Sequence, residues 1–231
     1  MPTVLITGAG RGIGLEFVRQ YAADGWRVLA CCRSPASADE LNAIAADSDG
    51  RVTLHRLDVD DGDSVAGLGT ELGAVPIDVL INNAGVMSQR GARRGDMDYA
   101  AWEDCLRTNV LGPMRVSEAL VDNLTAGDQK KLITISSRMG SIGLNAAPDS
   151  IVYRSSKAAV NMVMKCLAND LGGLGITTLC FHPGWVRTDM GTARADIAPE
   201  DSVAGMRQVI DGLAPADNGG FRNYDGAVLE W

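Results

Sequence analysis

Residues 4–14 read VLITGAGRGIG, a short apolar run followed at once by a glycine-rich turn. The pattern is T-G-x-x-x-G-x-G, whose fixed points are Gly8, Gly12 and Gly14. Glycines allow a tight turn and let the backbone approach a pyrophosphate at the N-terminus of the next helix. We therefore predict a strand over Val4–Ile6, a helix that opens near Ile13, and a dinucleotide site between them. A glycine-rich turn without a ligand is the alternative.

Further short apolar runs alternate with longer segments whose apolar residues recur every three or four positions, as at Leu15, Val18 and Ala22. The runs are Val4–Ile6, Val28–Cys31, Val52–Leu57, Val79–Ile81, Leu132–Ile135 and Ile176–Phe181. They are apolar on both alternating sets of positions rather than on one, which is typical of parallel strands covered on both faces. A late helix is expected over 200–213. This order predicts one α/β domain over residues 1–231, a Rossmann-like doubly wound parallel sheet of about seven strands with helices on both faces.

Composition narrows the classes of function. The chain has 231 residues, 46% hydrophobic and 22% charged, with a formal net charge of −8. An acidic surface repels phosphate backbones, so nucleic acid is not expected as a partner. No run approaches the ~18 apolar residues of a membrane span, and no leader pattern opens the chain, so a cytoplasmic location is expected. Five cysteines without paired spacing and two histidines show no metal-ligand pattern, so no metal is expected.

The residues after the second apolar run distinguish two dinucleotides. In an NAD site, an acidic residue about 20 positions after the glycines binds the ribose 2′-hydroxyl. Here Cys31-Cys32-Arg33-Ser34 stands at that point, with no acid before Asp39. The guanidinium of Arg33 suits a 2′-phosphate, and Arg11 in the glycine turn could reach the same phosphate from the other side. Two solvated surface arginines are the alternative, but these positions favour NADPH over NADH.

Tyr153 and Lys157 are four residues apart, so they lie on one face of a predicted helix. A nearby ammonium favours the phenolate, which would bring the tyrosine pKa toward the range of a useful acid or base. The same spacing is common in surface pairs. Ser137 follows the run Leu132–Ile135 at the edge where open α/β sheets bind ligands, and it could donate a hydrogen bond to a substrate oxygen. A serine that only caps the strand is the alternative.

Taken together, these motifs resemble the classical short-chain dehydrogenase/reductase family over essentially the whole chain. They occur in the family's order and close to its spacing, as Thr7–Gly14, Asn82–Gly85, Ser137, Tyr153 with Lys157, and Pro183-Gly184 followed by Thr188. The segments ISSRMGSIG at 135–143 and HPGWVRTDM at 182–190 are most similar to sniffer-type carbonyl reductases and C-factor-like proteins. The resemblance implies an oxidoreductase that uses NADP(H).

The resemblance also implies a role for each matching residue. Tyr153 would exchange a proton with the substrate oxygen, while Lys157 would lower its pKa and hold the nicotinamide ribose. Ser137 would orient the carbonyl group. Asn109 matches the family asparagine whose helix kink and ordered water link the lysine to solvent. The expected cofactor contacts, besides Tyr153 and Lys157, are Gly8, Arg11, Gly12, Ile13, Gly14, Arg33, Asp58, Val59, Asn83, Ala84, Gly85, Pro183, Gly184, Val186 and Thr188.

The chain departs from the family pattern before the tyrosine. Ser137 and Tyr153 are 16 residues apart, more than the family commonly has, and the extra residues fall in 144–150. Ser141 is therefore a rival for the catalytic serine, although Ser137 is preferred because it directly follows the strand. The segment 189–199 is short for a substrate lid and predicts an open pocket. The apolar residues best placed to line that pocket are Met87, Met139, Trp185 and Met190.

We expect an NADPH-dependent enzyme that interconverts a ketone or aldehyde and an alcohol. A quinone, steroid or acyl-thioester substrate stays open, as does a non-catalytic dinucleotide-binding signalling protein. A pure binder would need none of Asn109, Ser137, Tyr153 and Lys157, so their joint presence favours catalysis. A hydrolase is disfavoured because no G-x-S-x-G elbow occurs. Members of the family usually pair through two long helices, here about 97–123 and 152–171, so a homodimer is expected.

Overall fold

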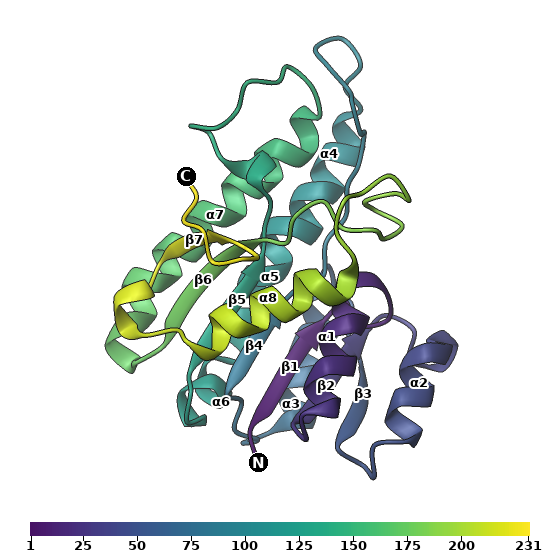
Figure 1. The fold of residues 1–231 in the computed structure, drawn as a ribbon, viewed down its shortest axis with the longest axis vertical. Coiled ribbons are helices and arrows are strands. Elements are labelled where there is room, and N and C mark those ends of the chain that lie inside the picture. The colour runs from purple at the N-terminus through teal and green to yellow at the C-terminus, as the bar shows by residue number, and fades with distance from the viewer.

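The computed structural model describes residues 1–231 and contains a seven-stranded sheet in the order β3-β2-β1-β4-β5-β6-β7, with every strand parallel to its neighbours (Figure 1). The strands are β1 Thr3–Thr7, β2 Arg27–Cys32, β3 Val52–Arg56, β4 Val79–Asn82, β5 Lys131–Ile135, β6 Thr177–His182 and β7 Gly220–Asn223. The helices are α1 Gly12–Ala23, α2 Asp39–Ala46, α3 Gly62–Leu72, α4 Tyr99–Leu106, α5 Gly112–Ala119, α6 Val121–Ala126, α7 Ile151–Leu171 and α8 Pro199–Asp211. This is the predicted doubly wound α/β fold.

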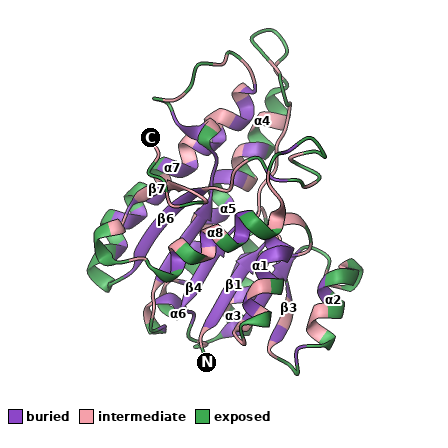
Figure 2. Cartoon of the chain, viewed as in Figure 1, coloured by how far each residue is buried: buried purple, intermediate pink, exposed green.

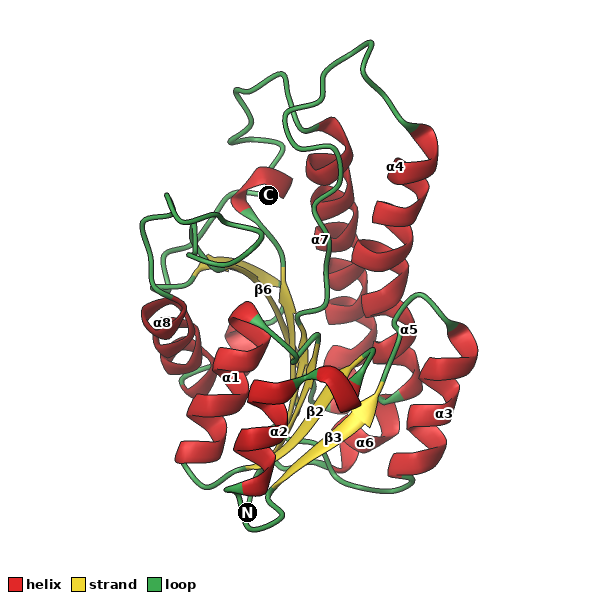
Figure 3. Ribbon diagram, turned by 90° about the vertical axis from the view of Figure 1, so that its right-hand side faces the viewer, coloured by secondary structure: helices red, strands yellow, loops and turns green.

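Helices cover both faces of the sheet. Seen along its edge, α1, α2 and α8 lie on one side, and α3 to α7 lie on the other (Figure 3). Successive residues of a strand point to opposite faces, so each face has its own core. Leu5 of β1 packs into one cluster, and its neighbours Val4 and Ile6 pack into the other. The central strands are therefore buried along their whole length, as their consecutive apolar residues predict (Figure 2).

The order of the strands fixes where a ligand can bind. β1 lies between β2 and β4, so the chain leaves β1 toward one side of the sheet and later returns on the other. The connections that follow β1 and β4 therefore run to opposite sides of the sheet. In open α/β sheets, ligands bind in the crevice at the carboxyl ends of two such strands. α4 and α7 rise beyond this edge and form one wall above it (Figure 3).

Two elements differ from the sequence-based expectation. The seventh strand, Gly220–Asn223, pairs with β6 and otherwise forms only an isolated bridge from Arg222 to Val228, and Phe221 is its one buried apolar side chain. Its sequence therefore lacks the run of apolar residues from which the other strands are predicted. The helix expected over about 97–123 is interrupted by a π-helical turn at Arg107–Leu111 and ends at Ala119, where α5 gives way to α6. No helix combines the length and hydropathy that a membrane span requires.

Candidate active site

The glycine turn joins β1 to α1 at the carboxyl edge of the sheet, as predicted. Gly8 and Gly12 have φ angles of +66° and +56°, which glycine adopts without strain. A Cβ atom on Gly14 would lie 2.3 Å from the carbonyl oxygen of Gly8, so any side chain there would push the turn apart. Gly8 and Gly12 are therefore favoured by their backbone conformation, and Gly14 by close packing against the turn.

Asn83 and Thr7 hold the turn from the side of β4. The Nδ2 amide of Asn83 donates to the carbonyl oxygens of Thr7 at 2.9 Å and Gly8 at 3.2 Å. The hydroxyl of Thr7 accepts from the backbone N–H groups of Asn83 and Ala84, both at 3.0 Å. The Nδ2 group of Asn83 is thus engaged by the glycine turn, and the cofactor contact that the resemblance implies for this residue stays a prediction. It is a positioning residue for that turn.

The two arginines predicted for a 2′-phosphate are both exposed. Arg33 directly follows β2 and makes no ion pair. Arg11 pairs with Asp189 at 3.0 Å, and their side chains are 78% and 80% exposed. Asp189 lies 178 positions away, so no local pattern predicts this ion pair, and the contact of Arg11 with a 2′-phosphate stays a prediction. Because water screens this exposed ion pair, the 2′-phosphate of a dinucleotide could compete with Asp189 for the guanidinium of Arg11.

Asp58 and Val59 follow β3 at the same edge of the sheet. The Asp58 side chain accepts from the N–H of Asp60 at 3.1 Å, and the Asp58 N–H donates to the hydroxyl of Ser64 at 3.0 Å. Val59 is buried against Gly112, where a Cβ atom would lie 2.9 Å from Cγ2 of the valine. This loop is therefore fixed beside the end of β2, on the side of the site where an adenine is expected.

Tyr153 and Lys157 lie one turn apart on α7, and both side chains are buried. The Nζ atom of Lys157 lies 5.7 Å from the centroid of the tyrosine ring and donates to the carbonyl oxygen of Ile135 at 2.9 Å. Ser137 follows β5 and opens a short 3-10 turn, in which its hydroxyl accepts from the N–H of Met139 at 3.1 Å. α7 and the end of β5 thus bring the three predicted catalytic residues to one place.

Burial has the largest effect on the pKa values of Tyr153 and Lys157. It raises the pKa of Tyr153 to about 12, although a hydrogen bond with Ser137 and the positive charge of Arg90 act in the opposite direction. Burial also lowers the pKa of Lys157 to about 8. Lys157 is not among the groups that shift the tyrosine pKa in the protein alone, so its expected effect on that pKa stays a prediction. The phenol is held protonated at neutral pH, which suits a proton donor.

Asn109 lies at the centre of the π-helical turn Arg107–Leu111, where the resemblance implies a kink. Its Nδ2 donates to the carbonyl oxygen of Val86 and to the hydroxyl of Ser156, both at 2.9 Å, and its Oδ1 accepts from the N–H of Val86 at 2.8 Å. Ser156 in turn donates to the carbonyl oxygen of Tyr153 at 2.8 Å. The asparagine therefore joins the loop after β4 to the helix that carries the tyrosine.

A cavity of about 680 Å³ opens above Tyr153 and Ser137. Ile13 of the glycine turn also lines it, as do all four apolar residues expected there, Met87, Met139, Trp185 and Met190. Leu144, Ala146 and Ala147, from the extra residues before the tyrosine, form another part of the wall. Ser141 is buried outside this cavity and its hydroxyl accepts from the N–H of Leu144 at 3.1 Å. The geometry therefore favours Ser137 over Ser141.

The segment after β6 lines the same cavity. Its four expected contact residues, Pro183, Gly184, Val186 and Thr188, all do so. Gly184 has a φ of +85°, and a Cβ atom there would lie 2.3 Å from Cδ1 of Ile197. The short lid segment folds back here, since the N–H of Arg187 donates to the carbonyl oxygen of Ile197 at 2.9 Å.

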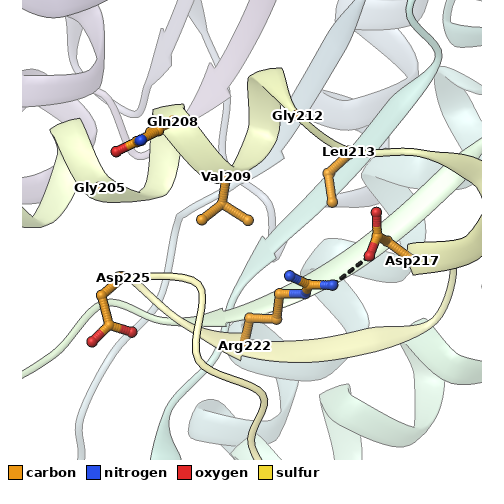
Figure 4. A pocket seen from close by; sticks show the side chains of 8 residues that line it. All are labelled: Gly205, Gln208, Val209, Gly212, Leu213, Asp217, Arg222 and Asp225. Atoms are coloured by element: carbon orange, nitrogen blue, oxygen red, sulfur yellow. Dashed lines mark hydrogen bonds and ion pairs between the residues drawn. The ribbon is translucent and has the colours of Figure 1, made fainter.

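A second cavity, of about 310 Å³, lies between α8 and the end of the chain, away from these residues. Arg222 reaches across it to Asp217, and Asp225 lies on its other side (Figure 4). It contains none of the predicted site residues. Of these two cavities, only the larger one is lined by predicted site residues.

The model of the short chain dehydrogenase family matches residues 2–197. The chain belongs to this family. The C-signal protein of Myxococcus xanthus is 44% identical over 156 residues, which cover 68% of this chain and 93% of that protein. The 1-hydroxy-2-glutathionyl-2-methyl-3-butene dehydrogenase of Rhodococcus sp. (strain AD45) is 35% identical over 237 residues, covering all of both chains.

Solved structures of carbonyl reductases share the whole fold of this short-chain dehydrogenase. An NADPH-bound carbonyl reductase from chicken fatty liver superposes with a TM-score of 0.91 at 33% identity, covering 100% of this chain and 99% of that one. The carbonyl reductase Sniffer of D. melanogaster gives a TM-score of 0.92 at 30% identity, covering 100% of both. The predicted similarity to this part of the family is therefore confirmed.

Several polar and charged residues that line the cavity were not predicted as site residues, among them Arg90, Arg138, Arg154 and His182. Two of them had a usable signal, because Arg138 directly follows Ser137 and His182 directly precedes Pro183. Arg90 lies in a loop between β4 and α4 and belongs to no motif. Its place in the site depends on how that loop folds over the cavity.

Proposed function

We propose that this short-chain dehydrogenase uses NADP(H) to interconvert a ketone or aldehyde and an alcohol, with Tyr153 as the proton donor in reduction. The observation that carries this proposal is the shared cavity, which is lined by Tyr153, Ser137 and Ile13 of the glycine turn. The hydroxyl group that would give up a proton thus faces the same space as the turn that would hold the dinucleotide. The NADPH-bound carbonyl reductase with the same fold supports the choice of cofactor.

The residues of the crevice fit a dinucleotide. Beside Gly12, a Cβ atom would meet only the side chain of Thr188, at 3.4 Å, so the turn is free of bulky neighbours on that side. Arg33 and Arg11 would hold the 2′-phosphate, and Asp58 with Val59 would contact the adenine. Gly85 would bring the backbone close to the nicotinamide ribose, because a Cβ atom there would lie 3.5 Å from Nζ of Lys157.

The chain's own residues would move the proton and orient the substrate. The bound dinucleotide supplies the hydride, which adds to the carbonyl carbon. Tyr153 would donate its phenolic proton to the carbonyl oxygen as negative charge develops on it, and the hydroxyl of Ser137 would hold that oxygen in place. The ammonium of Lys157 would stabilise the resulting phenolate until it is protonated again. Asn109 would keep the helix geometry that sets these distances.

The test is oxidation of NADPH and of NADH by the purified protein with a panel of ketones, aldehydes and quinones. We expect turnover with at least one carbonyl class and a preference for NADPH that weakens in Arg33→Ala. Equal use of NADH would contradict the roles of Arg11 and Arg33. Tight NADPH binding with no turnover on the whole panel would contradict the reductase proposal.

A second candidate is a dinucleotide-binding signalling protein. The observation that favours it is the 44% identity to the C-signal protein. This role would need cofactor binding without turnover, so the same panel separates the two. The buried set of Asn109, Tyr153 and Lys157 supports catalysis, because a binding protein gains nothing from an ammonium whose pKa burial has lowered.

We further propose that the chain folds as one domain and pairs as a homodimer through α4, α5 and α7. Three large apolar side chains are exposed on this side of the molecule, Tyr99, Leu111 and Met162. Exposed apolar groups that gather on one face mark interaction surfaces. Light scattering after gel filtration would give twice the monomer mass, and Met162→Glu would give the monomer mass. A monomer in the wild type would contradict the pairing.

A further inference from the structure

The charged residues that line the large cavity are opposite in sign to the net charge of the chain. The protein has 29 acidic residues and a net charge of −8, yet no aspartate or glutamate lines the cavity. Three arginines do, namely Arg90, Arg138 and Arg154. A cavity lined by cations alone in an acidic protein focuses a positive potential on its contents.

The three arginines differ in whether a carboxylate of the chain already pairs with them. Arg154 lies on α7 and is paired with Asp149, whose backbone carbonyl oxygen is 2.9 Å from Nε. Arg138 makes no ion pair and no side-chain hydrogen bond within the chain. Arg90 donates to the backbone carbonyl oxygen of Met190, a neutral group, and has no carboxylate partner. Two guanidinium groups of the cavity therefore lack a counter-charge.

Both free charges act on groups inside the cavity. The positive charge of Arg90 lowers the pKa of Tyr153, against the larger effect of burial. Burial and then the charge of Arg138 lower the pKa of His182 to about 4, so this imidazole stays neutral and does not add to the positive charge. The two guanidinium groups thus lie close to the site of chemistry, and Met87, Met139 and Leu144 supply apolar surface near them.

We infer that the substrate of this enzyme is a carbonyl compound with an apolar skeleton and a carboxylate, and that Arg90 and Arg138 bind the carboxylate. This inference rests on the proposed reductase function and names its substrate class. Arginine suits the role because its planar group can donate two parallel hydrogen bonds to a carboxylate. The carbonyl group would face Tyr153 and Ser137, with the carboxylate held toward the mouth of the cavity.

An isosteric pair of substrates tests the inference. Reduction of 4-oxo-4-phenylbutanoate and of its primary amide is followed with saturating NADPH at low salt, and the ratio of the two kcat/KM values is recorded. We expect the acid to be preferred about tenfold, with a ratio that falls toward one as salt screens the exposed arginines. The double variant Arg90→Gln, Arg138→Gln should lose the preference. Arg94→Gln, an exposed arginine of the same loop outside the cavity, should keep it.

Binding separates failure of this inference from failure of the proposed function. 4-Phenylbutanoate and 4-phenylbutanamide have no ketone, so calorimetric titration of both into the NADP⁺-loaded protein needs no turnover. Tighter binding of the acid, lost in the double variant and kept in Arg94→Gln, supports the carboxylate site even if neither ketone is reduced. Equal binding of acid and amide, or a preference that survives in the double variant, overturns it.

Discussion

Replacing Lys157 by methionine should make the protein more stable while abolishing its activity. The buried ammonium has a pKa of about 8, compared with 10.5 for a free lysine. Each unit of difference corresponds to about 1.36 kcal/mol, so the folded protein holds the charged lysine at a cost of about 3 kcal/mol. Methionine keeps the apolar stem and removes the charge. The hydrogen bond to Ile135 is lost in exchange, which offsets about 1 kcal/mol.

The net gain of about 2 kcal/mol should raise the melting temperature by about 4 to 8 °C at pH 7 for a chain of this size. The gain depends on pH with a definite sign. Below pH 8 both folded and unfolded lysines are protonated, so the full cost is present. Between about 8 and 10.5 the folded lysine is neutral and the cost falls with rising pH, so the variant and the wild type should converge.

The assay is chemical denaturation of both proteins between pH 6 and 10. Lys165→Met is the matched control, because Lys165 lies on the same helix with its side chain largely exposed and its amine also donates to a backbone carbonyl, that of Gly219 at 3.1 Å. It should give no comparable gain. A loss of stability in Lys157→Met, or an equal gain in both variants, would refute the reasoning.

Three further predictions follow from the glycine turn and the lysine. Gly14→Ala should destabilise the fold by about 2 kcal/mol and weaken NADPH binding, because the added Cβ atom would press on the carbonyl oxygen of Gly8. An unchanged melting temperature and an unchanged NADPH affinity would contradict this prediction. Asp189→Asn should release Arg11 and tighten NADPH binding about threefold with little effect on NADH, as calorimetry would show. In steady-state assays, kcat/KM for reduction should fall as pH rises above about 8 because Lys157 loses its proton, while a plateau to pH 10 would exclude that role.

The fold could be predicted because its signals are local. The five inner strands carry apolar residues on both faces, since helices cover both sides of them. Of the two edge strands, β3 still has the apolar residues Val52 and Leu54, whereas Gly220–Asn223 has only Phe221 and could not be found in the same way. The π-helical turn at Arg107–Leu111 was likewise hidden within a continuous helical pattern and was suggested only by the resemblance at Asn109.

The site was predictable where a residue type and its neighbours in sequence define the chemistry. The glycine turn, Ser137, Tyr153 and Lys157 meet as expected. What the sequence could not supply were effects of long-range packing. The amide of Asn83 is engaged by the glycine turn rather than free for a ligand, and Arg11 has a partner far along the chain. The raised tyrosine pKa likewise depends on burial, which no local pattern reports.

The central claim is that Tyr153 donates the proton that accompanies hydride transfer. Tyr153→Phe removes that proton and keeps the ring, so NADPH binding should stay within about twofold while turnover falls by at least ~100-fold. The most direct measurement is a single turnover of the enzyme–NADPH complex with a ketone that the wild type reduces. Loss of the NADPH absorbance decay in the variant, with binding intact, is the expected result. A decay at the rate of the wild type would contradict the proposed mechanism.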